Sequence, residues 1–163
     1  MCSSDLVDIA PGYLQSPVDG TAAPSAGTDQ FSDIVALLSD KIVILYSLGA
    51  SKLSQLGELV GYEPPVPLAF PGKIPVNVEV ADMNGDGYMD IVVLDQDSSA
   101  VWIYVNLGKR RFSQPFMFDT GTLPVEMFVA DVDADGCLDI VTADQTGKTL
   151  TSLRNMTATC RNF

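Results

Sequence analysis

Two short segments of the chain carry oxygen-bearing side chains at matched positions. Residues 82–90 read DMNGDGYMD and residues 131–139 read DVDADGCLD, so both follow the pattern D-x-[DN]-x-D-G-x-x-D. Side-chain oxygens at positions 1, 3, 5 and 9, with the backbone carbonyl of position 7, can surround one cation if the chain turns sharply at position 6. Gly87 and Gly136 stand at that position and permit such a turn. Hard oxygen ligands in a flexible loop favour Ca²⁺, so we expect two calcium sites.

Two alternatives to such a calcium loop share some of these residues: an ordinary turn and an EF-hand. Clusters of Asp, Asn and Gly also form ordinary turns. Repetition of the pattern in register favours a bound ion, because carboxylates in one short loop repel each other unless a cation neutralises them. An EF-hand requires a Glu at position 12 and helices on both sides. Val93 and Thr142 occupy position 12 here, which disfavours an EF-hand. The flanking runs are β-rich and lack helical periodicity, so we expect each loop to join two β-strands.

The loops belong to a longer internal repeat. Residues 75–106 and 124–155 align at a shift of 49 residues, with 13 of 32 positions identical. Short apolar runs rich in β-branched and aromatic residues predict strands, and the Gly, Asp, Ser and Lys clusters between them are typical of hairpin connections. The strands predicted in the middle copy are residues 76–80, 89–94, 101–105 and 112–118. Each unit is therefore a predicted four-stranded antiparallel meander, which is typical of a β-propeller blade.

The chain is accordingly expected to be all-β, a partial or assembling β-propeller of about three blades, fewer than natural rings hold. Residues 29–72 are the predicted degenerate blade, and residues 73–121 and 122–163 are blades with one calcium loop each. The last copy stops at Asn162-Phe163, so we expect its outer strand to be missing.

Residues 1–28 combine a short apolar segment, Ser4 to Ala10, with a linker rich in Pro, Gly, Ser and Ala. An unpaired strand edge accepts another strand. We therefore expect Ser4 to Ala10 to be a strand donor for the last blade, in the same ring or in the next molecule.

The two loops, each followed by Asp-Ile-Val, resemble the FG-GAP/VCBS repeats of integrin-type β-propellers. The resemblance extends over residues 29–163, although the Phe-Gly and Gly-Ala-Pro portions that name the family are not clear here. It implies Ca²⁺-stabilised blades, usually extracellular and non-catalytic, in adhesion, ligand binding or scaffolding. Only Asp29 and Asp33 match in the first copy, so we expect no metal there. By residue matching, the implied calcium ligands are Asp82, Asn84, Asp86, Tyr88 (carbonyl) and Asp90, and Asp131, Asp133, Asp135, Cys137 (carbonyl) and Asp139.

The composition argues against several classes of function. Nine Lys and Arg against 21 Asp and Glu give a net charge of −12, which disfavours binding to nucleic acid or to an anionic membrane surface. The chain has no His, the commonest general base and zinc ligand. Its paired carboxylates fall within the metal loops, so we expect no enzymatic activity. The N-terminus lacks the basic and apolar regions of a signal peptide, so the chain is either cytosolic or a mature piece or fragment. The family resemblance favours the second alternative, an extracellular or cell-surface protein.

Two smaller features concern covalent chemistry. The three cysteines form no CxxC pair, and Cys137 and Cys160 are candidates for a bridge. Asn155-Met156-Thr157 is an N-glycosylation sequon.

The function expected from these features is that of a non-enzymatic Ca²⁺-binding structural or adhesive module. Its partner would be another protein, either a further copy joined through open blade edges into a larger propeller or filament, or an extracellular partner. A lectin-like module that binds glycan is the alternative, with an aromatic platform of Trp102, Tyr104, Phe116 and Phe118, although strand aromatics more often lie in a core. A third reading is an accessory propeller fragment of a larger secreted enzyme.

Overall fold

Strands make up the regular structure of this protein. The computed structural model describes residues 5–14, 32–47, 61–156 and 160. These residues form eleven strands, and none of them belongs to a helix that is long and apolar enough to cross a membrane. The strands are β1 (Leu6–Gly12), β2 (Asp33–Leu38), β3 (Ile42–Leu45), β4 (Val66–Leu68), β5 (Pro75–Ala81), β6 (Asp90–Asp95), β7 (Ala100–Tyr104), β8 (Phe116–Asp119), β9 (Pro124–Ala130), β10 (Asp139–Asp144) and β11 (Thr149–Leu153).

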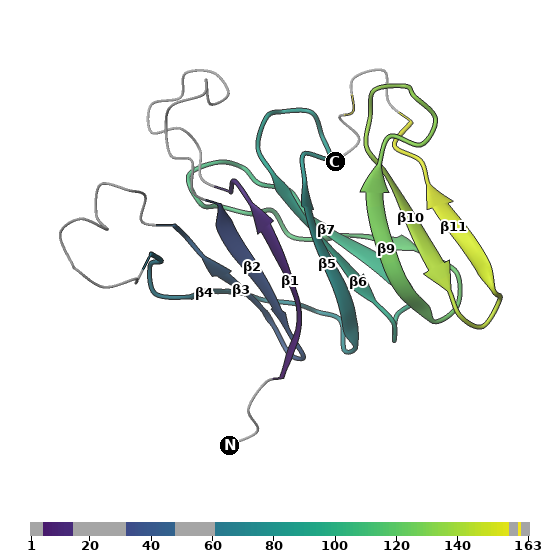
Figure 1. Cartoon of the computed structure of the whole chain (residues 1–163), viewed down its shortest axis with the longest axis horizontal. Helices are drawn as coiled ribbons and strands as arrows, with labels where there is room; N and C mark the ends of the chain where they lie inside the picture. Colours follow the sequence, from purple (N-terminus) through teal and green to yellow (C-terminus); the bar gives the residue numbers. More distant parts are fainter. Residues whose placement is uncertain (1–4, 15–31, 48–60, 157–159, 161–163) are drawn as a thin grey trace.

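The strands form three antiparallel sheets (Figure 1). The first sheet has the order β1-β2-β3-β4, the second β5-β6-β7-β8, and the third β9-β10-β11. Strands β9, β10 and β11 begin and end 49 residues after β5, β6 and β7, as the sequence repeat requires. The predicted all-β fold of antiparallel meander blades is therefore confirmed.

The predicted strand boundaries of the middle copy hold to within one residue for β5, β6 and β7. The fourth strand is shorter than residues 112–118 and begins at Phe116. Lys109 and Arg110 adopt positive φ angles of 54° and 59°, so the chain loops outward there. Phe112 then pairs only through an isolated bridge with Asn106.

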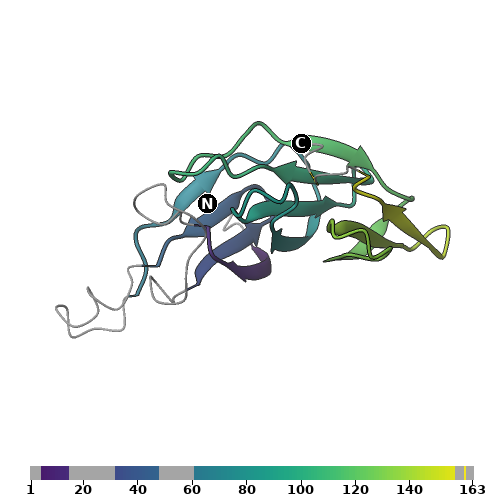
Figure 2. The ribbon, with the colours of Figure 1, turned by 90° about the horizontal axis from the view of Figure 1, so that it is seen from above.

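The sheets pack face to face as an open array, and β5 lies against both β1 and β9 (Figure 2). Because side chains alternate between the faces of a strand, the second sheet serves two cores. Ile91 and Val93 pack with the first sheet, whereas Val92 and Leu94 pack with the third. All six residues of β6 are buried, which explains why this strand reads as an unbroken apolar run between two Asp residues.

The N-terminal segment lies elsewhere than we expected. Residues of β1 pair with β2, from Leu6 opposite Leu38 to Gly12 opposite Asp33. The segment is therefore the first strand of the first sheet and does not complete the third. This pairing satisfies the backbone of β2 within the same chain and buries Ala10 in the first core.

Candidate metal centre

Both acidic loops connect the first and second strands of their sheets, β5 to β6 and β9 to β10, and lie at the same end of the array (Figure 1). Gly87 and Gly136, at position 6, both have a φ of 90°. A Cβ at either position would meet no atom within 4 Å. The backbone conformation, and not lack of space, therefore requires glycine at the sharp turn.

In the first loop, backbone N–H groups donate to the loop's own side-chain oxygens. The Asp82 carboxylate accepts the N–H of Asp86 at 3.1 Å and that of Gly87 at 2.9 Å. Asn84 Oδ1 also accepts the Asp86 N–H, at 3.0 Å, and Asp86 Oδ1 accepts the Tyr88 N–H at 2.8 Å. The chain thus wraps around the oxygens of positions 1, 3 and 5.

The second loop repeats this arrangement with more charge. The Asp131 carboxylate accepts the N–H of Asp135 at 3.2 Å and that of Gly136 at 3.0 Å. Oxygens of Asp131, Asp133 and Asp139 all lie within 4.8 Å of one another, a spacing that a single cation can bridge. Asp135 lies outside this group, and its Oδ1 accepts the Cys137 N–H at 2.8 Å.

Position 3 distinguishes the two loops. Asn84 is almost fully buried and donates through its amide to Asp86 at 3.0 Å. Its counterpart Asp133 is exposed and pairs with Arg154 at 3.5 Å. The first loop therefore holds three carboxylates and an amide, whereas the second holds four carboxylates with one guanidinium nearby.

Asp90, at position 9, fastens the first loop to the rest of its sheet. It is 0% exposed. Its Oδ2 accepts the Met83 N–H at 3.0 Å, and its Oδ1 accepts the Asn106 N–H at 2.8 Å. Burial raises the pKa of Asp90 to about 7, although these two hydrogen bonds lower it and the neighbouring acids Asp86 and Asp82 raise it further. A cation in the loop would oppose this rise because it favours the charged carboxylate.

The same arrangement, in which one buried Asp carboxylate accepts two backbone N–H groups, recurs in the other two sheets; we call it a clasp. Asp139 accepts the N–H groups of Val132 at 3.1 Å and Asn155 at 2.8 Å. In the first sheet, Asp33 accepts those of Leu14 at 3.0 Å and Ser47 at 2.7 Å. Asp33 therefore has a structural role even where the calcium pattern is degenerate. Asp29, the other residue matched there, lies outside the described residues.

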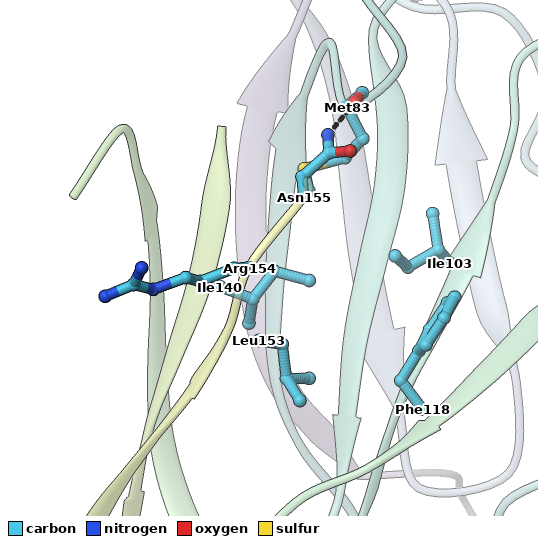
Figure 3. A pocket seen from close by; sticks show the side chains of 7 residues that line it. All are labelled: Met83, Ile103, Phe118, Ile140, Leu153, Arg154 and Asn155. Carbon is cyan, nitrogen blue, oxygen red and sulfur yellow. Dashed lines mark hydrogen bonds between the residues drawn. The ribbon is translucent and has the colours of Figure 1, made fainter. Parts of the chain in front are cut away.

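Side-chain amides connect these clasps from sheet to sheet. Asn155 Nδ2 donates to the Met83 carbonyl at 2.7 Å (Figure 3), and Asn106 Nδ2 donates to the Leu14 carbonyl at 3.0 Å. Met83 and Leu14 are themselves clasped through their N–H groups by Asp90 and Asp33. A continuous hydrogen-bonded relay therefore runs from the third sheet to the first, beside the acidic loops. It consists of Asp139, Asn155, Met83, Asp90, Asn106, Leu14, Asp33 and Ser47.

Position 7 of each loop also contacts the segment after the third strand. The Tyr88 ring lies 3.6 Å from where a Cβ on Gly108 would stand. Its counterpart Cys137 forms a disulfide with Cys160, the bridge for which these two residues were candidates. The side chain at position 7 thus attaches each loop to the segment after the third strand, by packing in the second sheet and by a covalent bond in the third.

The aromatic residues considered for sugar binding do not share one surface. Tyr104 is 1% exposed and Trp102 packs in the first core. Phe118 packs in the second core, and Phe116 is 41% exposed. Asn155 of the sequon is 4% exposed, and its amide nitrogen is held by the relay.

A cavity of about 80 Å³, partly open to solvent, lies between the second and third sheets (Figure 3). Asn155 closes its polar end, and none of the described residues donates to its buried Oδ1. The residues that line it are Met83, Ile103, Phe118, Ile140, Leu153, Arg154 and Asn155. The sequence pattern does not predict this cavity, although Asn155 is the last identical residue of the repeat, matched to Asn106.

Three antiparallel sheets stacked in one array, with acidic loops at one end, define a repeat protein of the β-propeller class. Residues 82–142, which contain both loops, match the model of the FG-GAP-like repeat. Over these residues the match supports the resemblance to FG-GAP-like repeats that the sequence predicted.

No curated protein matches the chain. Among solved structures, the Tc holotoxin pore of Photorhabdus luminescens is similar, with 20% identity and a TM-score of 0.40 over 76% of this chain. This chain spans 6% of the length of that chain. A likeness at this level carries no information on function.

Proposed function

We propose that this protein is a non-enzymatic, extracellular Ca²⁺-binding module that acts through contacts with other proteins. The observation that carries the proposal is the gathering of the Asp131, Asp133 and Asp139 oxygens within 4.8 Å in a loop with the calcium pattern. Three carboxylates at this separation repel each other, so a divalent cation would stabilise the folded loop. The first loop has the same backbone conformation and would take a second ion.

In the first loop, Asp82, Asn84, Asp86 and Asp90 would supply side-chain oxygens and Tyr88 its carbonyl. The second loop would use Asp131, Asp133, Asp135, Asp139 and the Cys137 carbonyl. Because the second loop carries one more carboxylate, it should bind Ca²⁺ more tightly.

Two features support an extracellular, non-catalytic role. A disulfide between Cys137 and Cys160 persists in oxidising compartments and is rare in the cytosol. The buried acids Asp90 and Asp139 use both carboxylate oxygens to accept backbone N–H groups, so they serve the fold and are not available as a free acid–base pair.

The outer faces of the array support self-assembly into a larger propeller or filament. On the face of the first sheet turned away from the second, alternation places Ile34, Ala36, Val43 and Leu45. The corresponding face of the third sheet carries Phe128, 49% exposed, and Leu150, 74% exposed. Each face has the side-chain alternation of an interface that the array already contains, so a further copy could stack head to tail.

Thermal unfolding in Ca²⁺ and in EGTA tests the calcium sites. A ligand present at about 100 times its Kd stabilises a folded protein by about 2.7 kcal/mol, so the melting temperature should rise clearly with Ca²⁺. The double variant Asp86→Asn/Asp135→Asn should lose this rise, whereas Asp119→Asn, which removes one carboxylate at an exposed strand residue, should keep it. An identical response of all three proteins would reject the sites.

Tb³⁺ luminescence separates the two loops. Tyr88 at position 7 should sensitise an ion in the first loop, while Cys137 at that position cannot. Asp86→Asn should therefore abolish the tyrosine-sensitised signal and Asp135→Asn should leave most of it.

Sedimentation velocity tests assembly: a species whose mass does not change with concentration would contradict head-to-tail stacking.

A further inference from the structure

The two acidic loops share a backbone turn but differ in what holds their side chains. In the first loop, Asn84 accepts the Asp86 N–H at 3.0 Å and donates to the Asp86 carboxylate at 3.0 Å. Asp133 stands at this position in the second loop, and its carboxylate has no N–H to donate. The Arg154 guanidinium, 3.5 Å from Asp133, offsets the added charge only weakly because its side chain is 57% exposed. The second loop therefore lacks the amide contacts of the first, while its carboxylates repel one another more strongly.

A covalent bond at position 7 holds the second loop instead. Cys137 is 3% exposed and forms the disulfide with Cys160. Its N–H donates to Asp135 Oδ1 at 2.8 Å, and its carbonyl is one of the oxygens that would hold the ion. The N–H of the preceding Gly136 donates to the Asp131 carboxylate at 3.0 Å. A displacement of the Cys137 backbone would therefore move one ligand oxygen and disturb the hydrogen bonds that position two ligand carboxylates.

The segment after β11 holds this loop at two points. Asp139, at position 9, accepts the Asn155 N–H at 2.8 Å, and Cys160 lies five residues further along the chain. Loss of the disulfide would remove the attachment at position 7 and leave the hydrogen bond at position 9. In the first loop, position 7 is attached by the packing of Tyr88 near Gly108, which a reductant does not affect. The two loops should therefore respond differently to reducing conditions.

The two sulfur atoms of the bridge differ in exposure. Cys137 is buried, whereas Cys160 is partly exposed. A thiolate of a dithiol reductant can therefore attack Cys160 Sγ and form a mixed disulfide with it, while Cys137 leaves as a thiolate and takes up a proton. The second thiolate of the reductant then displaces Cys160, which also takes up a proton. The protein gains two electrons and two protons in all, and the dithiol becomes a cyclic disulfide.

We infer that the Cys137–Cys160 disulfide is a redox switch for the calcium site of the second loop. The bridge holds this loop in its ion-binding conformation, and reduction by a dithiol weakens Ca²⁺ binding there but not in the first loop. The inference rests on the proposed Ca²⁺ binding, to which it adds a means of regulation. By thermodynamic linkage, Ca²⁺ in the second loop should favour the disulfide by the same factor by which the disulfide favours Ca²⁺.

Calcium titration by calorimetry, with the whole chain oxidised or kept in dithiothreitol, tests the switch. All proteins carry Cys2→Ser, so that the bridge contains the only remaining cysteines. In the Asp86→Asn chain the titration reports the second loop, which should bind Ca²⁺ about tenfold more weakly after reduction, a factor typical of coupled sites. Cys137→Ser/Cys160→Ser in the same chain should show the weaker affinity with and without dithiothreitol.

The first loop is the internal control for this titration. With Asp86 intact, the Tb³⁺ signal sensitised by Tyr88 should keep its affinity when the bridge is reduced. An unchanged first site also shows that the second sheet stays folded, so that weaker binding in the second loop would not reflect general unfolding.

The reverse measurement does not require the reduced protein to be folded. The chain is equilibrated in a mixture of reduced and oxidised dithiothreitol, with saturating Ca²⁺ or with EGTA, and mass spectrometry after alkylation gives the fraction still bridged. Ca²⁺ should raise the ratio of bridged to reduced protein about tenfold. Asp135→Asn should abolish this shift, whereas Asp86→Asn, the same substitution in the first loop, should retain it.

Two results would overturn the inference and leave the calcium sites in place. One is equal Ca²⁺ affinity of the second loop in the oxidised and reduced proteins. The other is an equal effect of Asp135→Asn and Asp86→Asn on the redox equilibrium, because the bridge would then be coupled to the whole fold and not to its own loop. Absence of Ca²⁺ binding by the oxidised Asp86→Asn chain would instead reject the second calcium site itself, and the switch with it.

Discussion

The interface between the first and second sheets and the interface between the second and third come from the same repeat but are filled differently. In the first interface, the hydroxyl of buried Tyr104 donates to the Ala69 carbonyl at 2.9 Å. Trp102 meets Phe70 there edge to face, with ring centroids 6.4 Å apart. At the shift of 49 residues, Leu153 replaces Tyr104 and Thr151 replaces Trp102. The second interface consequently keeps a cavity of about 80 Å³.

The hydrogen bonds that position neighbouring sheets are therefore distinct from the side chains that fill the space between them. The clasps of Asp90 and Asp139 and the side-chain amides of Asn106 and Asn155 are common to both interfaces. They set the position of neighbouring sheets. The residues that fill the space between the sheets differ, and a cavity remains where Leu153 and Thr151 stand in place of larger aromatic side chains.

The largest expected effect comes from removing the amide that joins the first two sheets. Asn106 is 0% exposed. It donates to the carbonyls of Leu14 and Met89 and accepts the Gly108 N–H. Asn106→Ala leaves these backbone groups without their partner, and we expect a loss of about 4 kcal/mol in the free energy of unfolding, measured in urea.

Asn155→Ala is the matched change in the second interface. Because Asn155 Oδ1 accepts no hydrogen bond from the described residues, its substitution should cost less, about 2 kcal/mol. Equal losses for the two variants would show that the relay is not stronger in the first interface.

The disulfide provides the next effect. Cys137 and Cys160 are separated by 23 residues, and a cross-link over such a loop restricts the unfolded chain by about 3 kcal/mol in the chain-entropy model. The Cys137→Ser/Cys160→Ser variant should lose about that much, measured by urea unfolding without reductant. The unmodified protein in reductant is the control and should lose the same amount. A stability unchanged by both treatments would contradict a covalent fastening of the third sheet.

Making the first interface resemble the second should have a smaller effect. Tyr104→Leu removes the hydrogen bond to the Ala69 carbonyl and opens a space in the first core. We expect a loss of about 2 kcal/mol, measured by thermal unfolding. If the surrounding side chains collapse into the space, the loss will fall well below this value, and the two interfaces differ less than their residues indicate.

The reverse change should have the smallest effect and the opposite sign. Leu153→Tyr fills the cavity of the second interface and should raise the free energy of unfolding by about 1 kcal/mol. Leu150→Tyr, on the exposed face of the same strand, should stay within about 0.5 kcal/mol of the unmodified protein. A destabilised Leu153→Tyr variant with intact strands would mean that the cavity cannot take an aromatic ring.

The sequence was informative where structure is local and repeated. Strands β5 to β7 follow from apolar runs bounded by turn residues, and the 49-residue shift then predicts β9 to β11. The loop conformation follows from the spacing of Asp with Gly87 and Gly136, whose φ of 90° a non-glycine residue would rarely adopt.

The pairing of strands that lie far apart along the chain could not be predicted from the sequence. The partner of β1 is β2, and nothing in the short Leu6–Gly12 segment specifies that strand over the edge of the third sheet. The sequence pattern predicts only a metal-ligand role for Asp90, because Asn106, whose N–H its carboxylate accepts, lies 16 residues away. The cavity depends on how Leu153 meets Ile103 and Phe118 across two sheets, which no spacing along the chain reveals.

The relay of clasps and amides has a consequence for how such a chain can change in length. The second and third repeats each bring an Asp that holds its own loop and an Asn that reaches the preceding repeat. At one end stands Ser47, which has no amide with which to reach further back. At the other end stands Val132, the counterpart of Leu14 and Met83. Tandem duplication of one repeat would thus extend the array beyond Val132 without a new kind of contact, so the protein can evolve by whole repeats in one direction.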